Sequence, residues 1–130
     1  MAGDGEIRSV QPATLLPPAG HYSPGVVAGG FVFVAGQLPI RADGTKLTDA
    51  PFAEQVQQVL ANVQAVLEAA GSSVQRLVQV RVYITDIQRW PEFNQLYAAW
   101  AGSAKPARAV VPVPLLHYGL MVEVEAMALA

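Results

Sequence analysis

Cysteine is absent from the 130 residues of this chain, and histidine is scarce. Without cysteine there is no disulfide framework, no cysteine nucleophile and no thiolate metal site. The two histidines, His21 and His117, stand alone and lack the paired spacing of metal ligands on one element. We therefore interpret both as structural or surface residues and expect no metal site.

Basic residues are also few: the sequence has 8 lysine and arginine residues and 10 aspartate and glutamate residues, which gives a formal net charge of −2. The basic residues are scattered and form no stripe that could follow a phosphate backbone, so we expect no nucleic-acid partner. No apolar run reaches the length of a membrane span, and the N-terminus lacks the pattern of a signal peptide. We therefore expect no membrane partner and a cytoplasmic location.

Apolar residues, in contrast, make up 52% of the sequence, which is ample for a core. A chain of this length is normally one domain, so we predict a single domain over residues 1–130. A helix is predicted over 51–70, where Pro51 suits the first turn and Gly71 the C-terminal cap. Its apolar residues fall at helical spacing: Phe52, Val56, Val59, Leu60, Val63, Leu67 and Ala70. Pro91 opens a second, shorter helix, which Gly102 closes.

The remaining segments predict strands. Residues 26–28 and 31–35 flank Gly29-Gly30, which matches a hairpin turn with positive φ at both central residues. Further strands are predicted at 7–10, at 78–85 (where Val78, Val80, Val82 and Ile84 share a face), at 106–110 and at 120–126. We interpret the last two as a hairpin joined by a turn-rich loop. The order βββαβαββ indicates an α+β fold, with a single mixed six-stranded sheet and two helices packed on one face.

The last strand separates its residues onto two faces by alternation. Val122, Val124, Ala126 and Ala128 are expected to face the helices. The opposite face carries Met121, Glu123, Glu125, Met127 and Leu129, a set too apolar for plain solvent and too charged for a core. A subunit interface explains this mixture, so we expect an oligomer whose sheets face inward.

Arg108 and Glu123 lie symmetrically about the loop of the predicted C-terminal hairpin. Without a bulge, they would sit opposite one another on the same face. An arginine fork can hold a carboxylate, and a neighbouring glutamate can activate a water beside it. The competing interpretation is a cross-strand ion pair, which contributes about 0 to 1 kcal/mol when exposed. Glu125 is interpreted as an interface hydrogen-bonding group or as the partner of Arg81.

Four stretches resemble the Rid family, the reactive intermediate deaminases that are also called YjgF-type proteins or endoribonuclease L-PSP. They are Gly20-His21-Tyr22-Ser23, 34–39 (VAGQLP), 93–97 (FNQLY), and Pro106-Ala107-Arg108 with 122–126 (VEVEA). The order and spacing of these stretches together are specific, and the resemblance covers nearly the whole chain.

The resemblance implies a chorismate-mutase-like fold and a homotrimer, with sheets inside, helices outside and sites between the subunits. It also implies hydrolysis of enamines and imines such as 2-aminoacrylate and 2-iminopropionate, giving 2-keto acids and ammonia. The implied partner is thus a small imine or keto acid that carries a carboxylate. No cofactor and no metal are implied.

Carried over by residue, the resemblance implies that Arg108 clamps the substrate carboxylate and that Glu123 positions or activates the attacking water. Tyr22 would line the pocket across the interface, although it could also simply pack down its loop. Asn94 would support the pocket by hydrogen bonding, or alternatively serve its own helix start. Gly36 matches a position where backbone approaches the ligand closely, which glycine permits because it has no side chain.

This sequence departs from the family pattern at two of the implied contact positions. Ala35 stands where the deaminating members usually have serine, so one polar contact is lost. Val110 stands where the family often has cysteine, and the contacts implied at Ala109 and Val110 are mainly through the backbone. Two other functions remain open: a module that binds a small carboxylate without turnover, and RNA cleavage, which fits the charge poorly.

Overall fold

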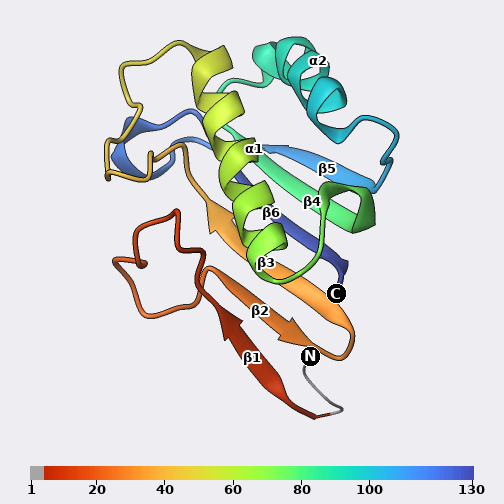
Figure 1. The fold of residues 1–130 in the computed structure, drawn as a ribbon. Helices are drawn as coiled ribbons and strands as arrows, with labels where there is room; N and C mark the ends of the chain where they lie inside the picture. The colour runs from red at the N-terminus through yellow and green to blue at the C-terminus, as the bar shows by residue number, and fades with distance from the viewer. Residues whose placement is uncertain (1–4) are drawn as a thin grey trace.

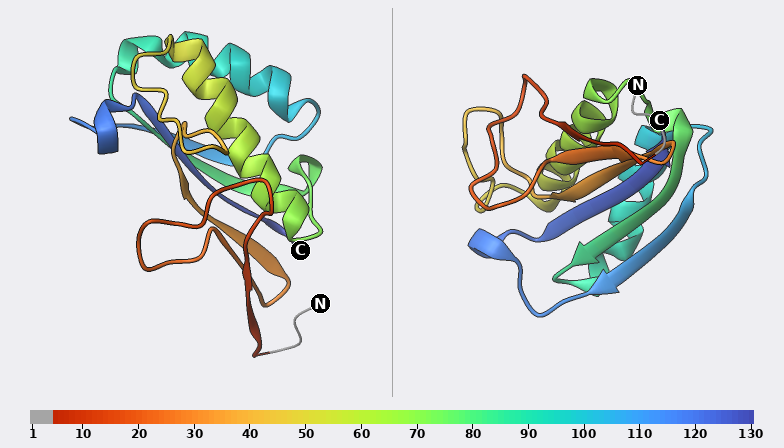
Figure 2. Two further views of the ribbon diagram at one scale, coloured as in Figure 1. Left: turned by 60° about the vertical axis from the view of Figure 1, so that its left-hand side comes forward. Right: turned by 90° about the horizontal axis from the view of Figure 1, so that it is seen from below.

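The computed structural model describes residues 5–130, which form a mixed sheet of six strands with two helices on one face (Figure 1). The strands are β1 (Ile7–Val10), β2 (Gly25–Ala28), β3 (Phe31–Gln37), β4 (Leu77–Ile84), β5 (Ala107–Pro112) and β6 (Val122–Leu129). The helices are α1 (Phe52–Ala69) and α2 (Trp90–Ala101). Figure 2 shows both helices on the same side of the sheet, which confirms the predicted α+β fold.

The strand order across the sheet is β1-β2-β3-β6-β4-β5, and β4 with β5 is the parallel pair. The predicted C-terminal hairpin is therefore wrong: β5 pairs with β4 at the edge, whereas β6 lies between β3 and β4. The physical reason lies in the unit β4-α2-β5. A helical crossover between two strands brings them side by side in parallel, and this leaves β6 to pair elsewhere.

Two local predictions are confirmed by the backbone. Gly29 and Gly30 have φ of 57° and 84°, as the two-residue turn between β2 and β3 requires. Gly71 has φ of 83° just beyond α1, where an L side chain would be strained. The apolar face of α1 packs on β3 and β6, and Val56, Val59 and Val63 on that helix are fully buried.

The two faces of the sheet differ as the alternation in β6 predicts. Val122, Val124 and Ala128 are fully buried beneath the helices, whereas Glu123 and Glu125 are half-exposed on the opposite face. We call this opposite face, which no helix of residues 5–130 covers, the open face (Figure 2). No helix of residues 5–130 has both the length and the apolar character needed to cross a bilayer.

One predicted orientation is wrong, because Val78 is 39% exposed and does not share the buried face of Val80, Val82 and Ile84. The pairing of β4 with β6 shifts register between Leu77 and Gln79, which marks a bulge at Val78. The extra residue lets Leu77 take the buried position three residues before Val80.

Candidate functional site

Arg108 lies on the edge strand β5, opposite Val80 of β4, and its side chain turns toward α2. Its Nη1 donates a hydrogen bond to Oδ1 of Asn94 over 3.0 Å. The Cζ atom stands 4.8 Å from the ring centroid of Tyr97, one turn further along the helix. Helix α2 thus holds the guanidinium through one hydrogen bond and one aromatic face. Asn94 makes the supporting contact that the sequence suggested.

The guanidinium of Arg108 keeps most of its hydrogen-bonding capacity. An arginine has five N–H donors, and Asn94 accepts from one of the nitrogens. The four ion pairs within the described chain do not include Arg108. Because β5 is an edge strand, part of the backbone at Ala109 and Val110 also points away from the sheet. This region, made by Asn94, Arg108, Ala109 and Val110, is suited to bind a carboxylate, and we call it the arginine half-site.

Tyr97 was not anticipated as part of this region. Its side chain is 7% exposed, and its hydroxyl is buried without a hydrogen-bond partner within the part of the chain that the structure describes. Burial raises the pKa of the Tyr97 hydroxyl, and the charge of Arg108 opposes that rise. The spacing from Asn94 to Tyr97 is three residues on a helix, which places both on one face and could have identified Tyr97.

Glu123 lies on β6 with its carboxylate over the backbone of Gly36 in β3. A Cβ added at Gly36 would overlap Oε2 of Glu123 and lie 3.2 Å from its Cδ. The pairing of β3 with β6 is irregular here, because Val34 opposes Ala126 while Gln37 opposes Val124. This bulge brings the 35–36 backbone against the carboxylate, and glycine is required for the close approach.

The surroundings of Glu123 make its carboxyl a weaker acid. Burial raises the pKa of the Glu123 carboxyl above its ordinary value of 4.5; the nearby His117 opposes this rise, and Glu125 adds to it. A carboxylate with a raised pKa is a better proton acceptor near neutral pH than an ordinary one. His117 was interpreted from the sequence as an isolated residue, and only the fold brings its charge close enough to act on Glu123.

Glu125, two residues further on, is occupied by other groups. It accepts a hydrogen bond from the Tyr83 hydroxyl over 2.5 Å and lies 3.8 Å from Nη1 of Arg81. The interpretation of Glu125 as the partner of Arg81 is thereby confirmed. Within residues 5–130, no cluster of three or more histidine, aspartate or glutamate side chains could hold a metal ion.

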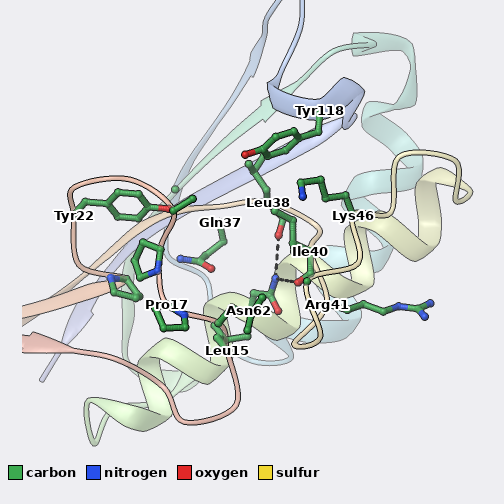
Figure 3. A pocket seen from close by; sticks show the side chains of 16 residues that line it. Leu15, Pro17, Tyr22, Gln37, Leu38, Ile40, Arg41, Lys46, Asn62 and Tyr118 are labelled. Carbon is green, nitrogen blue, oxygen red and sulfur yellow. Dashed lines mark hydrogen bonds between the residues drawn. The ribbon is translucent and has the colours of Figure 1, made fainter.

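Tyr22 and Gly36 both line a pocket of about 220 Å³ at one end of the sheet (Figure 3). Tyr22 is 56% exposed and lines this pocket, and its ring also lies beside Gly20 of its own loop. The N–H of Ala35 donates to the carbonyl of Pro24 over 2.9 Å, which ties the 15–24 loop to β3. We call Tyr22, Ala35, Gly36 and Glu123 the acid half-site.

The two half-sites do not meet within one chain, and the predicted placement of Arg108 opposite Glu123 is wrong. Strand β4 separates β5 from β6, and Arg108 is level with Ala126. Arg108 and Glu123 are thus about 10 Å apart across the sheet and about 10 Å apart along it. Their side chains also point to opposite faces of the sheet. One small substrate could not contact both residues of the same chain.

Comparison with known proteins places this chain in a family. The family model described as Endoribonuclease L-PSP matches residues 13–130. A RutC family protein of Pyrococcus horikoshii is 40% identical over 111 residues, which cover 85% of this chain and 88% of the relative.

Among the solved structures that are similar to the whole fold, two serve as examples. One is a putative endoribonuclease L-PSP from Entamoeba histolytica, with a TM-score of 0.91 and 32% identity over 96% of this chain and 100% of the other. The other is Escherichia coli TdcF with bound serine, with a TM-score of 0.88 and 29% identity over 95% and 98% of the two chains. The chain therefore belongs to the Endoribonuclease L-PSP family, the family of the Rid, YjgF and RutC proteins.

Proposed function

We propose that this protein hydrolyses enamines and imines that carry a carboxylate, such as 2-aminoacrylate and 2-iminopropionate, to 2-keto acids and ammonia. The observation that carries the proposal is the Glu123 carboxylate, which lies over the bare backbone of Gly36 with a raised pKa. A carboxylate so placed can take a proton from water next to a bound molecule. Membership of the Rid family supports the same reaction class.

The reaction needs few groups, because an imine conjugated to a carboxylate is already electrophilic. Water adds its oxygen to the C=N carbon while Glu123 accepts a proton, and the C–N bond then breaks to release ammonia. The carbon keeps the oxygen as the keto group. Protonation of the nitrogen comes from Glu123 or from a second water. Holding the substrate in place beside one oriented water supplies most of the required acceleration.

We further propose that the working site forms between copies of the chain, in a homotrimer whose sheets face inward. Arg108 of one copy would clamp the carboxylate, and Glu123 of its neighbour would act on the imine carbon. The opposite orientation of the two side chains supports this arrangement. A head-to-tail contact that pairs different surfaces closes into a ring at three copies when the rotation per copy is one third of a turn.

The open face has the composition of such an interface. Large apolar residues of the sheet remain substantially exposed there, among them Phe33 at 42%, Val111 at 38% and Leu129 at 42%. Arg81, Tyr83 and Glu125 form a polar network beside them. An apolar surface around a satisfied polar network is what a buried subunit contact requires.

The test measures ammonia or keto acid released from 2-aminoacrylate or 2-iminopropionate generated in situ. We expect acceleration by the wild-type protein, and loss of that acceleration in both Arg108→Ala and Glu123→Ala. Folding of each variant is checked by circular dichroism and thermal melting. A folded wild-type protein that accelerates neither substrate would contradict the proposal.

A second candidate function is a module that binds a small carboxylate without turnover, which the bound serine in the related TdcF structure favours. Calorimetry with a keto acid separates the two functions. In a binding module, Arg108→Ala abolishes binding and the wild-type protein shows no hydrolysis. In an enzyme, Glu123→Ala removes turnover and leaves keto-acid binding largely intact.

A further inference from the structure

The pocket next to the acid half-site has more room than the smallest imines need. Its volume of about 220 Å³ is lined by the 15–24 loop, the 36–46 segment, Asn62 of α1 and Tyr118 (Figure 3). That volume is several times the roughly 30 Å³ that one water molecule occupies in liquid water. The methylene or methyl group of 2-aminoacrylate or 2-iminopropionate would occupy only a small part of it. The pocket therefore fits a longer substrate side chain.

The lining of the pocket is positively charged. It contains Arg41 and Lys46, and it contains no aspartate or glutamate among the described residues. Arg41 is already occupied, because its Nη2 lies 2.8 Å from Oε1 of Glu54. Lys46 takes part in none of the ion pairs found in the described chain, and its Nζ stands 4.7 Å from the centroid of the Tyr118 ring. Among the described residues that line the pocket, Lys46 is thus the cation that remains for a ligand.

Tyr118 has a backbone conformation that is unfavourable for an L-amino acid. Within residues 5–130 it is the one residue other than glycine with positive φ, at 62°. Its carbonyl accepts a hydrogen bond from Oγ1 of Thr48 over 2.8 Å, two residues after Lys46. Strained backbone of this kind persists where the surroundings fix it, and it often marks a ligand site. Here the strain keeps the aromatic ring beside the ammonium group.

The two ends of the pocket differ in chemistry. Tyr22 and Gly36 of the acid half-site line the pocket, and the Glu123 carboxylate lies over the Gly36 backbone. Figure 3 shows Tyr22 and Lys46 on opposite sides of the cavity. A substrate whose imine carbon lies at Gly36 could therefore extend its side chain past apolar walls toward Lys46.

We propose that this pocket receives the side chain of the imine, and that Lys46 selects side chains that end in a carboxylate. The substrates would then be imines of acidic amino acids, which water converts to the corresponding 2-keto dicarboxylates and ammonia with no change of oxidation state. This inference rests on the proposed deaminase function. Lys46 and Tyr118 determine specificity, while Glu123 and Arg108 carry the reaction.

The experiment compares two imines of equal carbon number, which an amino-acid oxidase generates in situ from glutamate and from norvaline. We expect kcat/KM of the wild-type protein to be higher for the glutamate-derived imine. In Lys46→Gln the ratio of the two kcat/KM values should fall by about twofold to fivefold, as for loss of one exposed charge pair. Lys105→Gln removes the other lysine of the chain, outside the pocket lining, and should keep the wild-type ratio. A ratio that Lys46→Gln does not change would overturn the inference.

The alanine-derived imine separates failure of this inference from failure of the proposed function. If the wild-type protein hydrolyses that imine and does not prefer the glutamate-derived one, only the specificity inference is wrong. If it hydrolyses no imine, the proposed function is wrong. Calorimetry with 2-oxoglutarate and 2-oxopentanoate then tests the pocket alone. Tighter binding of 2-oxoglutarate that disappears in Lys46→Gln supports the inference, and equal binding by the wild-type protein contradicts it.

Discussion

Gly36→Ala separates the function of the acid half-site from the stability of the fold. The added Cβ would overlap the Glu123 carboxylate and lie 3.2 Å from its Cδ, inside the 3.4–4 Å of ordinary contact. Gly36 does not have positive φ, so its backbone accepts alanine without strain. The clash therefore falls on the flexible end of the Glu123 side chain, which has to move by about 1 Å. A displacement of that size can reduce a reaction rate about 100-fold.

The assay compares kcat for 2-iminopropionate with the melting temperature of the same sample. We expect kcat to fall about 100-fold, while the free energy of unfolding changes by less than about 1 kcal/mol. The double variant Gly36→Ala/Glu123→Ala should be no less active than Glu123→Ala alone, because both changes act through one carboxylate. A folded Gly36→Ala protein with kcat close to wild type would refute this reasoning.

Three further predictions concern other groups. Asn94→Ala should raise KM about tenfold, which is less than the increase in Arg108→Ala. In Asn94→Ala the Arg108 side chain loses its 3.0 Å hydrogen bond but keeps its charge. An unchanged KM in steady-state kinetics would contradict this prediction. Glu123→Gln should raise the melting temperature relative to wild type at pH 7 and not at pH 4. The raised pKa means that the Glu123 carboxyl binds its proton more tightly in the folded protein than in the unfolded one, so the stability of the wild-type protein falls as pH rises above 4.5. Equal differences in melting temperature at both pH values would argue against this prediction. Gln55→Leu should lower the free energy of unfolding by about 1 kcal/mol in urea titration, because the part-buried N–H of Met121 then loses its 2.9 Å acceptor on the fully buried Gln55. An unchanged midpoint would contradict this prediction.

Local patterns predicted the elements of this fold well. The helical spacing between Pro51 and Gly71 and the Gly29-Gly30 turn are properties of contiguous residues, and the structure reproduces both. The division of β6 into buried Val122 and Val124 and half-exposed Glu123 also follows from alternation alone. These features depend on steric constraints and burial among residues that are close in the sequence, so they can be predicted from the sequence alone.

Strand partners and the geometry of the site depended on longer-range contacts. The hairpin prediction joined strands that are neighbours in sequence, whereas β6 inserts between β3 and β4. The strand–helix–strand order around α2 indicates that β5 pairs in parallel with β4. With that pairing, the sequence would have predicted that Arg108 and Glu123 lie apart. The bulge at Val78 had a weaker signal, since apolar Leu77 and Val80 stand three residues apart. The contact of Thr48 with Tyr118 spans 70 residues and had no local signal.

The most direct test of the intersubunit site mixes two inactive variants, Arg108→Ala and Glu123→Ala. If Arg108 and Glu123 act from neighbouring copies, random co-assembly leaves about a quarter of the sites with both side chains. After the two proteins are unfolded together and refolded in equal amounts, we expect about a quarter of wild-type imine hydrolysis. Each variant refolded alone should remain inactive. A co-refolded mixture that forms mixed oligomers and stays inactive would contradict a site shared between copies.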